Sequence, residues 1–504
     1  MPKIVLTTLN SRYSHTSIAL RYLYANLKEL KKESKILEFV INGDAQSIAE
    51  KILDEEPKIV GFGVYIWNVL DIKKIIKIIK KVSFDTKIIL GGPEVSHFPL
   101  RVNFDEADYI IQGEAEISFY KLCGEILNGD LPKNRIIQAV LPDVKKIQMP
   151  YPYYSKSDIQ NRKIYVEASR GCPFRCEFCL SSLDERVRYF DMEKLLEAFE
   201  TLWQKGVRNF KFIDRTFNLN IEIANRLIDF FLSKKDDFSL HFEVIPDSFP
   251  DTLKERIKQF PPSSLQLEIG IQTLNENIAK NINRRLNTEK IEKNIRFLEQ
   301  SNVHMHLDLI VGLPGEDLKS FADNLNRLVC MTRSEIQIGI LKKLSGTTIN
   351  RHDIKYAMIY NSEPPYDILQ NAFISFKEMQ KMKRFARFWD LTYNSGNFYH
   401  TIPIMWEDDK DVFKNFYDFS QWLYNQSEST WHISLNRLSE FVFRYLTEVL
   451  GKEPSRIADS IIKDIIRING RSIPEYLRKY ATKIPDLRKT TIQKHNKRQI
   501  LHSL

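Results

Sequence analysis

The sequence predicts an α/β protein in three parts: a doubly wound parallel sheet, a partial parallel barrel and a mainly helical region. From residue 3 to about residue 127, short apolar strands alternate with amphipathic helices, which is typical of a parallel sheet covered on both faces. A second series of six strand and helix units runs from residue 164 to about residue 341, which indicates an open, partial (β/α)6 barrel. After about residue 350 the pattern becomes helical and aromatic, as in LSEFVFRYLTEVL.

Each expected strand is a short apolar segment, and the helices between them carry isoleucines at helical spacing, as in DIKKIIKIIKKV. Five helices are expected in the first part. The expected strands of the first part are 3–9, 35–40, 59–64, 87–90 and 108–111. Those of the second part are 164–168, 209–213, 240–244, 265–269, 304–310 and 336–341. Residues 128–160 contain prolines and tyrosines without periodicity and are predicted to be a linker. The predicted boundaries are therefore 1–129, 130–160, 161–350 and 351–504.

The composition is that of an ordinary globular protein with a basic tail. Hydrophobic residues make up 43% and charged residues 28%, and no apolar run approaches the roughly 20 residues that cross a bilayer. The first residues, MPKIVLTTLN, show no secretory signal, so a cytoplasmic location is expected. The net charge is +9, and much of the surplus lies from Lys483 onward. Such a tail can bind RNA through phosphate contacts, so RNA stays open as a partner, although a solvated terminus and a small-molecule substrate are favoured.

Three of the five cysteines lie in one loop. The segment EASRGCPFRCEFCLSS places Cys172, Cys176 and Cys179 directly after the first strand of the second series. Iron–sulfur cubanes ordinarily take four thiolates, and no fourth cysteine is near, so one iron of a 4Fe-4S cluster would be open to another ligand. A zinc site with one histidine is the alternative, but His97 and His241 are distant in the sequence. The other two cysteines are expected to be buried thiols: Cys123 and Cys330.

This cysteine spacing after a first strand resembles the radical S-adenosylmethionine (SAM) superfamily. In that family the open iron binds SAM, and an electron from the cluster cleaves it to a 5′-deoxyadenosyl radical. The resemblance implies an electron donor such as flavodoxin or ferredoxin. It extends to later strand ends, where FIDRTFN, FEVIP, GIQT, GLPGE and LKKLSGT follow in the family's order. The residues that it implies for SAM binding are Phe178, Asp214, Thr216, Asn218, Glu243, Gln272, Gly312, Pro314 and Leu344.

Four loops of the first part lie where a doubly wound sheet binds its ligands, beyond the carboxyl ends of the strands. They are NSRYSHTS, YIWN, GGPE and GEAE. The paired glycines of GGPE let a bulky group approach the backbone, and Tyr65 and Trp67 offer a broad apolar surface, which suits a flat macrocycle. Taken alone, these features also fit a plain turn and a core tryptophan.

Together with the barrel, these loops resemble cobalamin-binding radical SAM proteins, whose flavodoxin-like first domain holds cobalamin beside a paired glycine. The match runs to about residue 350, and RYSHTSIALRYL with the C-terminal region resembles a subgroup whose extension has no settled function. The family's D-x-H-x-x-G motif is absent, so His15 is expected to pack or hydrogen-bond rather than to bind cobalt. The residues implied for cobalamin binding are Tyr13, His15, Tyr65, Trp67, Asn68, Gly91, Gly92, Pro93, Glu94, Gly113, Glu114 and Glu116.

The resemblance implies an enzyme that methylates an unactivated carbon of an unknown substrate. A cobalamin-assisted rearrangement or cyclisation without methyl transfer is a second reading. Methylthiolation of tRNA would need a second cluster, and Cys123 is the only cysteine before the three in the loop. A cobalamin sensor without catalysis is disfavoured because the three cysteines and the ordered strand-end motifs are intact. No protein base is identified.

Overall fold

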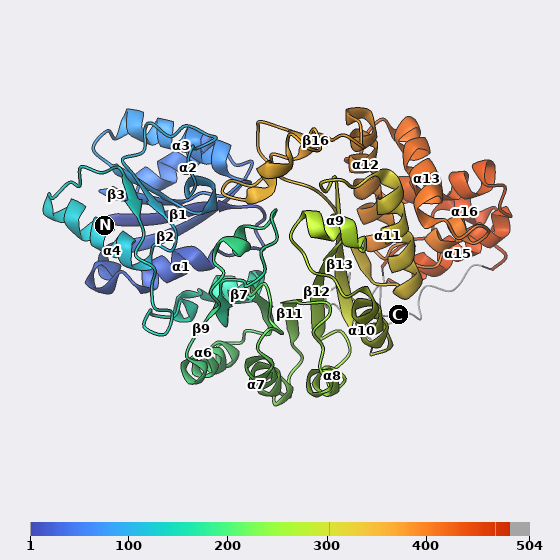
Figure 1. Cartoon of the computed structure of the whole chain (residues 1–504), viewed down its shortest axis with the longest axis horizontal. Coiled ribbons are helices and arrows are strands. Elements are labelled where there is room, and N and C mark those ends of the chain that lie inside the picture. Colours follow the sequence, from blue (N-terminus) through green and yellow to red (C-terminus); the bar gives the residue numbers. More distant parts are fainter. Residues whose placement is uncertain (1, 302, 469, 484–504) are drawn as a thin grey trace. The chain divides into compact units, whose positions relative to one another are not determined.

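The computed structural model describes residues 2–301, 303–468 and 470–483 (Figure 1). Contacts within the chain divide it into two compact units. The first unit holds residues up to 243 together with 342–350 and 361–367. The second holds the described residues of 244–341, 351–360 and 368–504.

A parallel sheet of six strands forms the N-terminal part of the first unit, in the order β2-β1-β3-β4-β5-β6. The strand order reverses between β1 and β3, which is where doubly wound sheets bind ligands. The expected doubly wound sheet is confirmed. Its strands are β1 (Ile4–Asn10), β2 (Ser34–Val40), β3 (Ile59–Gly63), β4 (Lys87–Gly91), β5 (Tyr109–Gln112) and β6 (Ile136–Gln138).

Helices cover both faces of this sheet, each over its own apolar core. Helices α2 (Ala45–Leu53) and α3 (Val69–Val82) cover one face, and α1 (Ile18–Ala25) and α4 (Glu116–Asn128) the other (Figure 1). Alternate strand residues point to opposite faces, which separates the two cores. Only four of the five expected helices form. The β4–β5 connection holds just the short 3-10 helix Pro93–Val95, because this segment also contains Pro99 and prolines supply no amide donor.

The predicted linker is more regular than its sequence indicates. Strand β6 comes from it, and α5 (Lys156–Asn161) begins with a capping box between Ser155 and Asp158. The buried Arg21 side chain of α1 lies 2.8 Å from carboxylate oxygens of both Glu38 and Asp158. These ion pairs fasten the segment to the sheet. The domain boundaries themselves stay a prediction.

The second strand series is shared between the two units, and all six expected strands are present. In the first unit, β7 (Ile164–Val166), β10 (Asn209–Phe212) and β11 (Ser239–Val244) run parallel in that order. In the second, β12 (Leu265–Gln272), β13 (His304–Val311) and β14 (Glu335–Ile340) do the same. The helices between them are α6 (Met192–Gln204), α7 (Ile221–Leu232), α8 (Asp251–Ile257), α9 (Glu276–Asn281), α10 (Thr288–Gln300) and α11 (Leu318–Met331). Parallel neighbours require such crossover segments.

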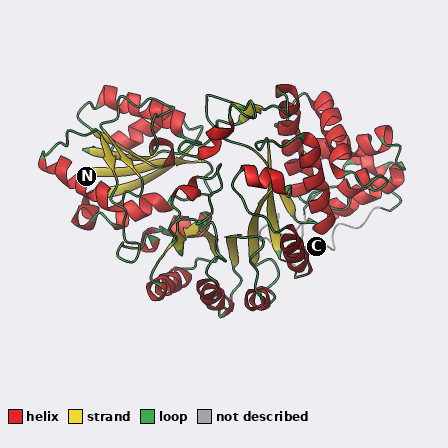
Figure 2. Cartoon of the chain, viewed as in Figure 1, coloured by secondary structure: helices red, strands yellow, loops and turns green. Residues whose placement is uncertain are grey.

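The C-terminal region is mainly helical, as expected (Figure 2). An aromatic cluster forms part of its core, in which the Trp389 ring lies 5.9 Å from Phe385 and 4.8 Å from Phe416. None of the helices in the described ranges has both the length and the apolar character of a bilayer-spanning segment. The elements are the hairpin β15 (Ile359–Tyr360) and β16 (Ile368–Gln370), then α12 (Phe376–Trp389), α13 (Val412–Ser427), α14 (Leu435–Arg444), α15 (Pro454–Ile466) and α16 (Glu475–Arg478). Two π-helical turns extend α12 and α14: Asp390–Asn394 and Tyr445–Val449.

Candidate functional site

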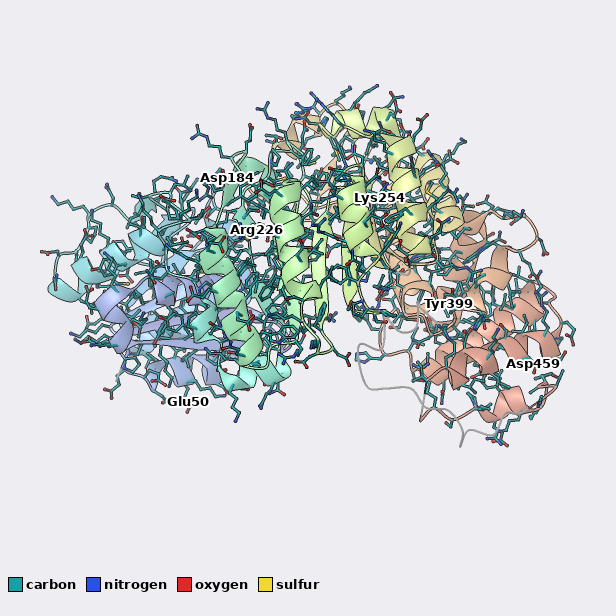
Figure 3. All side chains as sticks on the ribbon, turned by 90° about the horizontal axis from the view of Figure 1, so that it is seen from below. Glu50, Asp184, Arg226, Lys254, Tyr399 and Asp459 are labelled. Atoms are coloured by element: carbon teal, nitrogen blue, oxygen red, sulfur yellow. The ribbon has the colours of Figure 1, made fainter. Side chains whose placement is uncertain are left out.

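The loop that carries the three cysteines follows β7 and is closed at its base by a short antiparallel ladder. Strands β8 (Ser169–Arg170) and β9 (Arg188–Tyr189) pair there, so residues 171–187 form a closed loop. Gly171 has a φ of +90°, and a Cβ at this position would collide with the carbonyl of Arg186. The amide of Cys172 donates to the carbonyl of Asp184, labelled in Figure 3, at 2.9 Å. Backbone contacts therefore fix both ends of the loop. We call residues 171–187 the cysteine loop.

The cysteine side chains suit a group larger than a single ion. Cys172 and Cys176 are buried and Cys179 is half-buried. Burial raises the pKa of the Cys172 thiol, so a cationic group is needed to hold it as a thiolate. Among the described residues, the one set of three His, Cys, Asp or Glu side chains whose ligand atoms all lie within 4.8 Å of one another does not include these cysteines. Thiolates on one zinc ion would lie closer than that, so the loop fits a cubane better than zinc.

Asp214, at the carboxyl end of β10, holds the segment from which the cysteine loop departs. Its carboxylate accepts hydrogen bonds from the Ala168 amide at 2.9 Å and the Ser169 hydroxyl at 2.6 Å. The side chain is buried, and burial raises its pKa to about 7 although these hydrogen bonds act in the opposite direction. Asp214 thus positions the loop, and a contact from it to SAM stays a prediction.

Other predicted SAM residues of the first unit gather at the ends of β10 and β11. Glu243 accepts from Arg215, with both carboxylate oxygens 2.8 Å from one guanidinium nitrogen. Its carbonyl accepts from the amide of Phe217 at 2.9 Å, which joins the two strand ends. Thr216 and Asn218 are buried on either side of Phe217. Two further predicted residues of this unit are half-buried: Phe178 and Leu344.

In the second unit, Gln272 combines backbone strain with an unpaired polar atom. Its φ is +67°, at a bulge in β12, and its buried Oε1 has no hydrogen-bond partner among the described residues. Such strain and an orphaned acceptor are typical of ligand-binding positions. Gly312 also has a positive φ, and a Cβ there would lie 2.8 Å from Ile368. Pro314 is buried in the same turn, and its carbonyl accepts from Asn281 at 2.8 Å. The predicted SAM residues therefore fall in both units.

A cavity of about 690 Å³ lies within the first unit, on the face of the first sheet that α1 and α4 cover. Gly61, Gly63 and Gly91 line it from the sheet, since Gly63 pairs with Gly91 and Gly61 lies two residues earlier on the same face. Leu23 of α1 and Phe119 of α4 are among its other walls. Its volume is in the range of small-molecule and cofactor pockets. We call this space the domain cavity.

The cysteine loop itself contributes to the domain cavity through Leu180, Leu183 and Asp184. The predicted cobalamin residues divide into two groups. Those that line the cavity are Tyr65, Gly91, Gly92, Pro93, Gly113, Glu114 and Glu116. Those that are absent from its lining are Tyr13, His15, Trp67, Asn68 and Glu94.

The second group holds the loops rather than facing the cavity. The buried amide of Asn68 and the indole of Trp67 each donate to the carbonyl of Leu9 at 3.0 Å. Glu94 accepts from the hydroxyl of Tyr366 at 2.6 Å, and burial raises the pKa of its carboxyl. Tyr13 is exposed. Position after a strand end identifies the loop, but the direction of each side chain depends on tertiary contacts that the sequence pattern does not contain.

His15 makes a short hydrogen bond between its Nδ1 and the hydroxyl of Tyr165, and the two rings are stacked. Burial and the nearby charge of Lys163 lower the pKa of the imidazole. This contact accords with the expected hydrogen-bonding role. Whether His15 binds cobalt stays a matter of prediction.

The two glycines of GGPE differ in their surroundings. Gly92 has a φ of +107°, and a Cβ there would lie 2.5 Å from the carbonyl oxygen of Val64. Glycine is thus required at this position by the neighbouring backbone of the protein. At Gly91 a Cβ would meet only the carbonyl of Ile111, at 3.9 Å, and the residue lines the domain cavity. Gly91 is therefore the glycine that leaves room for a ligand.

Arg170 connects the cysteine loop to the GEAE segment. Its guanidinium lies 2.7 Å from Glu114, 2.7 Å from Glu116 and 2.9 Å from Glu167, and the side chain is 13% exposed. Arg188 binds Glu114 as well. Glu114 and Glu116 are thus ion-paired residues of the cavity wall. Sequence reasoning missed Arg170, and it missed Gly61 and Gly63, which strand-interior glycines at a spacing of two could have indicated.

The two remaining cysteines differ from each other. Cys123 is buried as expected, and burial raises the pKa of its thiol. Cys330 is exposed, so the expectation of a buried thiol is wrong for it. The buried stripe of α11 runs through Phe321, Leu325 and Leu328, and residue 330 falls outside that stripe.

A sheet domain with a cavity beside β3 and β4, followed by parallel strand and helix units with a three-cysteine loop after the first strand, is the arrangement expected of a cobalamin-binding radical SAM protein. Three family models agree: B12 binding domain over residues 4–122, Radical SAM superfamily over 166–328, and a protein of unknown function, DUF4080, over 354–503. The chain is a radical SAM enzyme with an N-terminal B12 binding domain and a C-terminal DUF4080 region. As such it requires a reductant.

The curated proteins that are similar to this chain include two methyltransferases. The uncharacterized methyltransferase PH0819 of Pyrococcus horikoshii is 24% identical over 71% of this chain and 87% of its own length. The cobalamin-dependent radical SAM methyltransferase TokK of Streptomyces tokunonensis is 25% identical over 56% of this chain and 46% of its own length. The chain therefore spans less than half the length of TokK.

A solved structure shares the fold. The cobalamin-dependent S-adenosylmethionine radical enzyme OxsB, with aqua-cobalamin and S-adenosylmethionine bound, superposes with a TM-score of 0.63 over 92% of this chain and 79% of that chain. The sequence identity is 13%, so the likeness concerns the fold alone.

Proposed function

We propose that this chain is a cobalamin-dependent methyltransferase that transfers a methyl group to an unactivated carbon of a small-molecule substrate. The observation that carries the proposal is that the cysteine loop lines the domain cavity within one unit, through Leu180, Leu183 and Asp184. This geometry would hold a cluster and a large cofactor side by side. The names of PH0819 and TokK, both methyltransferases, support the reaction type.

The chain's residues fit both groups. Cys172, Cys176 and Cys179 would supply three thiolates to a 4Fe-4S cluster, and no fourth cysteine lies nearby in the sequence, so one iron stays open for SAM. The glycine-lined floor of the domain cavity would admit the nucleotide tail of cobalamin. When bound, the cluster with SAM supplies a 5′-deoxyadenosyl radical and cobalamin supplies a methyl carrier.

Other residues would orient the cysteine loop and shield the cofactor from water. Asp214 fixes the start of the cysteine loop, and Arg170 joins the loop to Glu114 and Glu116 in the cavity wall. The apolar lining from α1 and α4 excludes water from the space where the cofactor would lie. Flavodoxin or ferredoxin is the proposed electron donor. The proposed location is the cytoplasm, where thiols stay reduced.

A rearrangement or cyclisation without methyl transfer is the second candidate. It is kept because a cysteine loop that lines a large cofactor cavity would serve either reaction. Both candidates use the same residues of this chain, so product analysis has to separate them.

Anaerobic reconstitution tests the proposal. We expect about four irons per chain, retention of cobalamin and reductant-dependent formation of 5′-deoxyadenosine from SAM. Cys172→Ala, Cys176→Ala and Cys179→Ala should each lose the iron, while Cys123→Ala and Cys330→Ala should keep it. A metabolite screen should then yield a product heavier by one methyl group. Stoichiometric zinc in place of iron would overturn the cluster assignment, and an isomerised product without added mass would favour the second candidate.

A further inference from the structure

A cluster of possible metal ligands lies in the second unit, at the amino ends of β13 and β14. Nε2 of His304 and Nε2 of His306 lie 3.1 and 3.0 Å from the same carboxylate oxygen, Oε1 of Glu335. The ligand atoms of the three side chains all lie within 4.8 Å of one another. Gln272 and Gly312 stand at the opposite, carboxyl ends of the strands, so this cluster is separate from the predicted SAM residues of the unit.

The register of the strands explains why these side chains meet. His304 and His306 are two residues apart on β13 and therefore point to the same face. Glu335, the first residue of β14, stands directly opposite His306. On the other side, Gln266 of β12 stands opposite His304, and its amide nitrogen lies 2.8 Å from Nε2 of His306. Three neighbouring strands thus direct polar side chains toward one point.

The separations match those between ligands of one small cation. Zinc bonds of about 2.0–2.1 Å to nitrogen and oxygen place tetrahedral ligands about 3.3 Å apart. The side chains of His304 and Glu335 are each 4% exposed and that of His306 is 20% exposed, so an ion would be shielded and still reachable. Two imidazoles and a carboxylate are a ligand set that zinc prefers.

Two side chains of β12 and a water molecule are the candidates for a fourth metal ligand. The Gln266 side chain offers an amide oxygen if its amide is turned over, since amide nitrogen and oxygen are interchangeable in shape. Glu268 stands opposite His306 in the register of β12. Water is the third choice. Any of these would supply the fourth ligand of a tetrahedral site.

We propose that His304, His306 and Glu335 bind one divalent cation of the zinc class and that this ion ties β13 to β14 at their amino ends. The competing arrangement is a hydrogen-bonded triad, in which the two imidazoles contact Glu335 and no ion binds. The two differ in a property that is independent of the radical reaction: metal content.

The test uses the full chain with its iron–sulfur cluster reconstituted, so that the thiols of the cysteine loop are occupied. After zinc addition and gel filtration, elemental analysis should find about one zinc per chain in addition to iron. The half-buried His306 is the least disruptive position, and His306→Ala and Glu335→Gln should each weaken zinc binding at least about 100-fold in a chelator competition. The exposed His432 supplies a matched control, since His432→Ala should retain the zinc.

Thermal unfolding gives a second measurement. Zinc should raise the Tm of the wild-type protein and of His432→Ala, and it should leave the Tm of His306→Ala unchanged. Iron content and circular dichroism verify that each variant is folded. Absence of zinc in the wild-type protein would show a triad without an ion, and equal zinc binding by His306→Ala would show that zinc binds at other residues. Either result would overturn the proposal without affecting the proposed function.

Discussion

At the scale of single residues, Gly91 and Gly92 show how neighbours with the same side chain meet different constraints. At Gly92 a side chain is excluded by the positive φ and by the nearby carbonyl of Val64. Gly91 has free space on the cavity side. Substitution of Gly92 should therefore affect folding, and substitution of Gly91 should affect ligand binding.

We expect Gly91→Leu to abolish cobalamin retention while the Tm and the iron content stay close to those of the wild-type protein, because the side chain would occupy the domain cavity. Gly92→Ala should lower the free energy of unfolding by about 1–3 kcal/mol through backbone strain. Equilibrium dialysis and denaturant unfolding measure the two effects. Gly124→Leu, in α4 with no atom within 4 Å of an added Cβ, is the control. Normal cobalamin binding by Gly91→Leu would disprove this location for the cofactor.

At the scale of elements, Arg170 joins the short ladder β8–β9 to the start of α4. We expect Arg170→Met to lower the free energy of unfolding by about 3–5 kcal/mol, because Glu114, Glu116 and Glu167 would lose their shared cation in a largely buried position. Arg170→Lys should be more stable than Arg170→Met but less stable than the wild-type protein, since one ammonium cannot reproduce the paired N–H donors of the guanidinium.

The cysteine loop supplies a control for this comparison. Arg175 pairs with Glu185 at 2.7 Å, and the two side chains are 66% and 49% exposed. Arg175→Met should therefore change stability by less than about 1 kcal/mol. Similar losses in the two variants, measured by urea unfolding, would mean that the burial of Arg170 is not what matters.

A second prediction at this scale concerns Glu407, which pairs with Lys452 just before α15 and with Arg456 in its first turn. Glu407 accepts from Arg456 at 2.6 and 2.8 Å and from Lys452 at 2.8 Å, and these bonds lower its pKa to about 2. Because the folded-state pKa lies below the ordinary value of 4.5, the carboxylate stabilises the fold above about pH 4.5, and that contribution is lost as the pH falls toward 2.

Glu407→Gln should accordingly reduce stability near neutral pH by less than about 1 kcal/mol, given the partial exposure of the side chain, and it should flatten the acid limb of the stability curve. Unfolding measured from pH 3 to pH 7 checks both effects. Asp408→Asn, at a side chain that is 81% exposed and binds the same Lys452, should change the curve less. An unchanged acid limb in Glu407→Gln would show that the Glu407 carboxylate does not cause this pH dependence.

At the scale of the whole molecule, the basic tail bears on the choice of substrate. Residues 484–504, which carry most of its charge, lie outside the described residues. We expect truncation after Asp486 to leave iron, cobalamin and RNA affinity unchanged, since a small-molecule substrate is favoured. Filter binding at several salt concentrations is the measurement. Weaker RNA binding with a flatter salt dependence in the truncated chain would instead support RNA as the partner.

Much of the architecture follows from local pattern, and the exceptions have physical causes. The eleven expected strands all form because buried parallel strands are short apolar runs that stand out from amphipathic helices. Strand β6 has three residues and no buried one, so no such signal exists. The expected cysteine loop is present as a closed loop. The strained turn at Gln272 and the partners of Arg170 arise from tertiary packing, which periodicity does not describe.

The shared wall of the domain cavity has a consequence for how the protein is assembled. Leu180 and Leu183 belong to the loop that carries the cysteines and also border the space proposed for cobalamin. A cofactor seated there would restrict the loop and so strengthen its hold on the cluster, and thermodynamic reciprocity requires the cluster to strengthen the hold on cobalamin equally. The two cofactors should therefore bind cooperatively, so that chains already loaded with the cluster retain cobalamin more tightly than chains without it.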